Sequence, residues 1–295
     1  MPLRRDPLPR MAGHLAFMRA PRVGLADLRP GMVAALGVAR DGTGPWGGLT
    51  RFGPTALRET SAYFGSHFSA NMKAAMDIDR RRVLSGGMMG GRLVDLGDLA
   101  VEHLPVAQAH AGIREAVCAL SSLGATALLL GGDLDIVAPA IEGAHAAHRA
   151  GGVTRVQLGG VAAACDELAV RSVLFHVAQS SRVQHDAGPG TQPVRLMPSW
   201  VRTADPAALR GRLQEALQGQ AAFVVLDLSV FAAHWHGMHA AAPLEGPGLR
   251  EVRRLMEVLG TLPIAGLAVT GLDATRCGLS TVKTGQRPAS GPSRP

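Results

Sequence analysis

The chain has 295 residues, 47% of them hydrophobic, which is enough to bury one substantial core as a single α/β domain. The net charge of +7 comes largely from arginines near the chain ends, and one tyrosine without basic–aromatic interleaving argues against a nucleic-acid-binding surface. The cysteines Cys118, Cys165 and Cys277 fit neither a disulfide framework nor a zinc site, and no stretch forms a signal peptide or reaches transmembrane length, so we expect a cytoplasmic protein that binds no membrane.

Short apolar runs recur along the chain, and most of them lack period-two alternation. This pattern is typical of strands covered on both faces of a parallel sheet. The runs lie at 33–38, 93–96, 127–130, 155–158, 172–177, 193–197, 222–228 and 264–270.

Helical patterns lie between many of these runs. The segment from Pro105 to Leu123 places one apolar stripe on a single face: Val106, Ala109, Ile113, Val117 and Leu120. Asp205 followed by Pro206 predicts a capped helix start, after which a second stripe runs to Gly219: Leu209, Leu213, Ala216 and Leu217. A third stripe, ending at Gly260, comprises Leu249, Val252, Met256 and Leu259. Strands alternating with helices predict an α/β fold with helices on both faces of one parallel sheet. We expect an N-terminal extension at 1–30, one domain at 31–276 and a disordered tail at 277–295.

Three motifs carry a family resemblance. The segments GGLTRFGPTALRETS (47–61), VDLGD (94–98) and LLLGGDLDI (128–136) resemble the arginase/agmatinase (ureohydrolase) patterns G-x-R-x-G-P-x-x-I-R-x-x-S, D-x-G-D and G-G-D-H-S. The resemblance implies a three-layer arginase-like fold around a parallel sheet of about eight strands. It also implies that the scaffold residues are retained: Arg51, Gly53, Pro54, Arg58, Ser61, Asp95, Gly97, Asp98, Gly131, Gly132 and Asp133.

The same resemblance implies that the metal-binding chemistry has been lost. The ligand positions of the family, at three strand tips, are occupied here by Leu134, Gly159, Val161, Ala163, Asp227 and Ser229. The glutamate that faces the substrate guanidinium in the family corresponds to Gly271. A single carboxylate can neither hold two divalent ions nor activate a bridging water, so we expect no catalytic residue, metal or cofactor in this chain.

Three groups of residues leave other interpretations open. His234, His236 and His239 could hold zinc, nickel or copper, although a loop at an interface explains the cluster as well. Asp133, Asp135 and Asp227 could bind one hard cation weakly, or could cap helices and pair with arginines. A shifted register at the second tip would bring in Cys165, Asp166 and Glu167 at the expense of a longer turn.

A retained scaffold with lost ligands resembles the metal-free subunit of a heteromeric guanidine or biguanide hydrolase such as metformin hydrolase. The expected role is that of an inactive subunit that supports an active ureohydrolase paralogue. The resemblance implies that the paralogue holds binuclear nickel or manganese and cleaves linear amidine C–N bonds. It also implies that the two chains form a hetero-oligomer, a hexamer as in the family. The charged fraction of 18% fits a surface covered by another subunit, or equally a GC-rich genome. The alternatives are a small-molecule-binding regulatory pseudoenzyme and a hydrolase with a relocated metal site.

Overall fold

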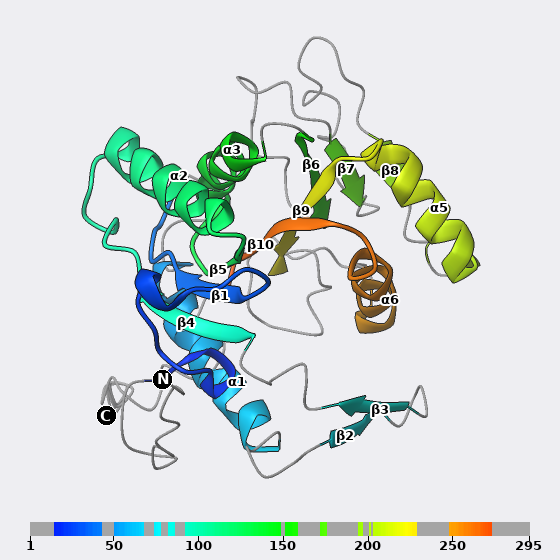
Figure 1. The fold of residues 1–295 in the computed structure, drawn as a ribbon, viewed down its shortest axis with the longest axis horizontal. Helices are drawn as coiled ribbons and strands as arrows, with labels where there is room; N and C mark the ends of the chain where they lie inside the picture. The colour runs from blue at the N-terminus through cyan, green and yellow to red at the C-terminus, as the bar shows by residue number, and fades with distance from the viewer. Residues whose placement is uncertain are drawn as a thin grey trace, which may run out of the picture.

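The fold is a three-layer α/β arrangement around an eight-stranded sheet whose paired strands all run parallel (Figure 1). The computed structural model describes residues 15–42, 50–67, 74–77, 82–85, 92–148, 151–158, 172–175, 194–196, 201, 203–228 and 248–272. The strand order is β4-β1-β5-β10-β9-β6-β7-β8. The predicted fold class is therefore confirmed.

The strands of this sheet form where the apolar runs predict them. They are β1 (Val33–Gly37), β4 (Leu93–Asp98), β5 (Thr126–Leu130), β6 (Val153–Leu158), β7 (Ser172–Phe175), β8 (Val194–Leu196), β9 (Ala221–Asp227) and β10 (Ile264–Thr270). Every residue of β6 is buried, as expected for a strand covered on both faces. A separate antiparallel pair, β2 (Ala74–Asp77) with β3 (Arg82–Ser85), is an addition that the apolar pattern does not predict.

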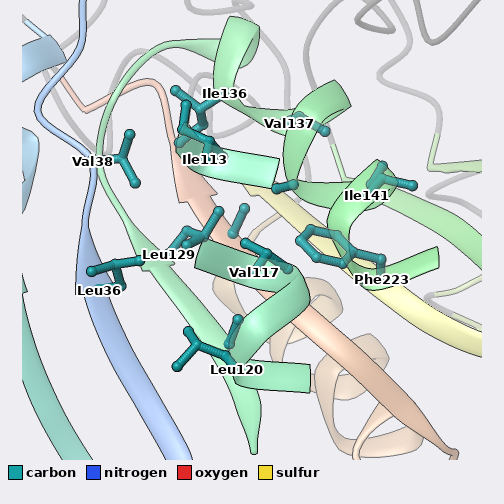
Figure 2. Close-up of a cluster of buried hydrophobic side chains, with 14 of the residues drawn as sticks. Leu36, Val38, Ile113, Val117, Leu120, Leu129, Ile136, Val137, Ile141 and Phe223 are labelled. Carbon is teal, nitrogen blue, oxygen red and sulfur yellow. The ribbon is translucent and has the colours of Figure 1, made fainter. Parts of the chain in front are cut away.

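Helices cover both faces of the sheet. The first face carries α2 (Val106–Ser122) and α3 (Val137–Ala147), whose side chains form one core with Leu129 and Phe223 of the strands (Figure 2). The second carries α5 (Pro206–Leu217) and α6 (Leu249–Leu259), while α1 (Gly53–His67) packs through Leu57 near β1 and β5. The 3-10 turns η1 (Phe17–Arg19), η2 (Leu25–Asp27), η3 (Thr50–Phe52) and η5 (Leu134–Ile136) lie outside the helices.

The apolar stripe of α2 is buried as predicted, with one exception. Ala109, Ile113, Val117 and Leu120 are buried, whereas Val106 is 47% exposed, because it is the first residue of the helix and projects beyond the neighbouring core. The opposite helix, α3, approaches α2 closely at Gly143, where a Cβ atom would lie 2.3 Å from the carbonyl oxygen of Arg114. Glycine at this position lets the two helices pack backbone to backbone.

The part of the expected N-terminal extension that the structure describes, 15–30, packs on the domain. Backbone hydrogen bonds join Pro21 and Val23 to Asp95, so this segment runs beside β4 at the edge of the sheet. Leu28 is 5% exposed and belongs to the core under α2. The predicted tail at 277–295 lies outside the described residues. None of the described helices is long and apolar enough to cross a membrane.

Candidate functional site

The strand tips to which the motifs point lie at one edge of the sheet, because β5, β10 and β9 are neighbours and run parallel. The GGD turn follows β5, Gly271 follows β10, and Asp227 is the last residue of β9. Carboxyl ends of parallel strands are the usual position of binding sites in such folds. This edge is therefore the candidate site.

The two glycines after β5 make a turn that no other residue type fits. Gly131 and Gly132 have φ of +77° and +80°, and a Cβ on Gly131 would lie 2.2 Å from Cδ of Pro54. The Gly131 amide donates to the Val269 carbonyl at 2.8 Å, and the Gly271 amide donates to the Gly132 carbonyl at 3.1 Å. The turn therefore joins the tips of β5 and β10 and lets the start of α1 pack against them.

The first tip carries Leu134, the residue that the sequence resemblance aligns with a histidine ligand of the family. Asp133 is the N-cap of η5, and its carboxylate accepts from the Leu134 amide at 2.7 Å. Leu134 packs against the core between the sheet and α2 and α3. An apolar side chain in this place contributes to packing and offers no electron pair to a metal.

The next residue, Asp135, forms an ion pair with an arginine that the motif analysis did not single out. Nε of Arg40 donates to Oδ2 of Asp135 at 3.0 Å, and the Arg40 side chain is 8% exposed. Nε2 of His110, on α2, lies 3.7 Å from the same oxygen. Burial raises the pKa of Asp135, and the charge of Asp133 adds to the rise, while Arg40 and His110 oppose it.

At the tips of β9 and β10, the carboxylate of Asp227 occupies the space that a side chain on Gly271 would need. Asp227 is 3% exposed, and a Cβ on Gly271 would lie 2.2 Å from its Oδ1 atom. Gly271 also has φ of +73°, where a side chain is strained. The backbone conformation of Gly271 and its neighbour Asp227 thus both favour glycine at this position.

The described residues do not assemble a metal site. No three His, Cys, Asp or Glu side chains within the described ranges are grouped so that they could hold an ion. Asp133 and Asp135 interact with each other, while Asp227 ends a strand that β10 separates from β5. The remaining candidates lie outside the described residues: Gly159, Val161, Ala163, Ser229, His234, His236 and His239.

The scaffold motifs form a charge network between α1 and β4, in which Arg58 and Asp95 are buried and Asp98 is about half exposed. Arg58 donates to Asp95 from Nε at 2.8 Å and from Nη2 at 3.1 Å, and its Nη1 atom donates to Asp98. Asp95 also accepts the amides of Phe17 and Gly97, at 2.7 and 2.8 Å. Burial opposes ionisation of both partners, but these hydrogen bonds outweigh it, so the pKa of Asp95 is lowered and that of Arg58 is raised.

Two further motif residues connect neighbouring segments. The Ser61 hydroxyl donates to the Arg58 carbonyl at 2.9 Å and accepts the Met18 amide at 2.8 Å, which ties the N-terminal segment to α1. Arg51 is more exposed. Its amide donates to Asp41 at 2.8 Å, and its guanidinium lies 5.1 Å from the Phe52 ring centroid. These contacts hold segments of the fold together.

This architecture is the arginase-family ureohydrolase fold. A model of the Arginase family matches residues 32–158. Among solved structures, proclavaminate amidino hydrolase from Streptomyces clavuligerus is 19% identical with a TM-score of 0.67, covering 91% of this chain and 92% of that one.

Two other structures are similar to a comparable degree. A hypothetical agmatinase from Burkholderia thailandensis is 19% identical with a TM-score of 0.69, over 91% of this chain and 85% of its own. Formimidoylglutamase from Bacillus subtilis is 14% identical with a TM-score of 0.66, over 94% of this chain and 90% of its own. At these identities the likeness is one of fold.

Proposed function

We propose that this chain is a catalytically inactive subunit that assembles with an active, metal-bearing ureohydrolase paralogue. The proposal rests on the contrast between the scaffold residues, which are present, and the residues at the metal-ligand positions, most of which are of types that do not bind metal. The Arg58–Asp95–Asp98 network is present, with Arg58 and Asp95 buried. Leu134 and Gly271, by contrast, are the residues that the sequence resemblance aligns with a metal ligand and with the substrate-binding glutamate of the family. A chain that keeps the frame without the ligands is suited to structural or regulatory support of a partner.

The proposed inactivity follows from the small number of residues that could bind metal. Two divalent ions that activate water need several carboxylates or imidazoles in a defined geometry. Asp227 alone supplies one carboxylate, and Leu134 fills the neighbouring ligand position with hydrocarbon. The metal, nickel or manganese, then belongs to the partner.

The substrate class of the complex is inferred from likeness. Two of the similar structures are named as an amidino hydrolase and an agmatinase, and the sequence resembles the heteromeric branch that acts on guanidines and biguanides. We therefore infer that the complex cleaves a linear amidine C–N bond in a guanidine or a metformin-type biguanide.

The test compares three preparations: this chain, its paralogue and the co-expressed pair. Each is assayed for nickel and manganese content and for release of urea or guanylurea from guanidine and biguanide substrates. We expect turnover from the pair alone, with metal present in proportion to the paralogue. Full activity and stability of the paralogue without this chain would contradict the proposal.

A matched variant tests whether this chain holds any of the metal. Asp227→Asn removes the last carboxylate at a family ligand position, and we expect the metal content of the purified pair to be unchanged. If the chain alone binds stoichiometric metal and turns over substrate, the ligand assignment is wrong, and His234, His236 and His239 become the next residues to replace.

A further inference from the structure

Arg40 is a buried cation at the first tip that the family motifs do not single out. It follows β1, its side chain is 8% exposed, and its Nε atom donates to Oδ2 of Asp135 at 3.0 Å. Its Nη1 atom donates to the carbonyl oxygens of Val101 and Leu104, at 3.3 and 3.2 Å. One guanidinium therefore joins the end of β1 to η5 and to the loop before α2.

The oxygen atoms around this guanidinium are of the kind that a hard metal ion takes. One carboxylate oxygen and two backbone carbonyl oxygens converge on it, from positions 135, 101 and 104. Hard cations in proteins are held by carboxylate and carbonyl oxygens of this sort. A guanidinium supplies positive charge as well, and its five N–H donors can reach several acceptors at once. The chain thus meets these acceptors with one of its own side chains.

The main chain of Arg40 is anchored independently of the guanidinium. Its carbonyl oxygen accepts the amide of Asp133 at 3.1 Å and the hydroxyl of Thr50 at 3.4 Å, and its amide donates to the Val38 carbonyl at 3.0 Å. These bonds do not involve the side chain, so they should survive its replacement. A substitution at Arg40 therefore tests the guanidinium separately from the backbone links between β1, η3 and the β5 tip.

A metal ion at the same tip is the competing interpretation. Oδ1 of Asp135 and Nε2 of His110 are buried atoms without a hydrogen-bond partner in the described structure, and this nitrogen lies 3.7 Å from Oδ2 of Asp135. An ion bound to these atoms would have to approach the guanidinium of Arg40, which stays charged in proteins. Because like charges repel strongly in a place sheltered from water, Arg40 disfavours the ion.

We propose that Arg40 takes the part of a metal ion at the first tip: its guanidinium holds Asp135 and the 101–104 loop together, so this tip folds without metal. The proposal accounts for a disagreement between the family and this chain. The resemblance aligns Leu134 with a histidine ligand, and no three possible ligands are grouped within the described ranges. The inference concerns the folded chain alone and does not depend on the proposed function.

Chemical rescue of Arg40→Ala tests the guanidinium directly. The variant removes the cation and leaves its three acceptor oxygens, and we expect the melting temperature to fall by about 5 °C. Guanidinium chloride at about 10 mM, suited to a site of millimolar affinity, should restore at least half of this loss. Sodium chloride at the same concentration should restore none of it, because a sodium ion has no N–H donors.

Arg51→Ala is the matched control for this rescue. The Arg51 side chain is 55% exposed, and its Nε atom lies 3.5 Å from Oδ2 of Asp41. We expect a much smaller loss in this variant and no recovery with guanidinium, since an exposed ion pair contributes little.

Hydrogen–deuterium exchange of the full chain locates the effect. Arg40→Ala should lose protection at 101–104 and 134–136, and guanidinium should restore it. If Arg40→Ala does not fold, Asp135→Asn gives the same information, because Arg40 then lacks its anion and the 101–104 loop should lose protection although Asp135 is remote from it in sequence.

The unsubstituted chain tests the competing interpretation. Protection at 101–104 and 134–136 should be the same after treatment with EDTA and after addition of nickel or manganese. A rise in protection there with either metal would overturn the proposal. So would an Arg40→Ala variant that is as stable as the unsubstituted chain, or one that sodium chloride restores as well as guanidinium does.

Discussion

At the scale of the residue, Gly271 carries two separate constraints. Its φ of +73° lies in the left-handed region, and the carboxylate of Asp227 occupies the space of a side chain. A larger side chain at this position would therefore need both the backbone and Asp227 to move. The local geometry of the two strand tips favours glycine here.

This reasoning predicts the effect of Gly271→Ala on the free energy of unfolding. The strained φ costs about 1 kcal/mol for a non-glycine residue, and the contact with Asp227 adds a further loss of about 1–3 kcal/mol. Gly219→Ala is the matched control, since Gly219 has φ of +81° with no atom within 4 Å of the added Cβ. Urea denaturation of both variants measures the difference, and equal losses would contradict the account.

A second residue-scale prediction concerns Asp95 and pH. Its pKa is lowered in the folded state, so it contributes stability that is present above the unfolded carboxyl pKa, near 4, and lost as pH falls through the folded value. Asp95→Asn should lower the free energy of unfolding at pH 7 by about 3 kcal/mol, because buried Arg58 loses its buried anionic partner and keeps only the half-exposed Asp98. The variant should also lose part of the acid dependence below about pH 4.

Denaturant titrations between pH 2 and pH 7 check this, with Asp27→Asn as the control, because the Asp27 carboxylate is in an exposed turn. An acid dependence of Asp95→Asn identical to that of the unsubstituted chain would show that Asp95 does not carry the effect.

At the scale of the element, the start of α5 shows how a local sequence signal becomes a helix boundary. Asp205 accepts the Ala207 amide at 3.0 Å, and Pro206 occupies the first turn, where its missing N–H leaves no bond unmade. The other end is Gln218, in a left-handed conformation. The stripe Leu209, Leu213, Ala216 and Leu217 is buried between these two ends, as the sequence predicts.

Removing this cap should destabilise the protein modestly. We expect Asp205→Ala to lower the free energy of unfolding by about 1 kcal/mol, the usual cost of losing an N-cap acceptor. Asp205→Asn keeps an oxygen that can accept the Ala207 amide and should lose much less. Thermal and urea denaturation of the two variants provide the comparison, and equal losses would assign the effect to charge instead of to the hydrogen bond.

At the scale of the whole molecule, the sequence determined which segments become strands and helices. The apolar runs are long enough, and uniform enough, to specify strands buried on both faces, and the i, i+3, i+4 stripes specify the helices that cover them. The short β2–β3 pair was not predicted, because four residues of mixed polarity carry little periodicity. The retained glycines and charges at 131–133 and 95–98 also indicated where the strand tips lie.

Tertiary structure alone decided which side chains meet at those tips. Arg40 pairs with Asp135, and Asp227 approaches Gly271, at the ends of strands whose order in the sheet differs from their order in the chain. Such contacts depend on strand order and register, which a single sequence specifies only through the sum of all its packing interactions. The type of each element is set locally by periodicity and caps, whereas the charge environment of the site is set by crossovers between distant strands.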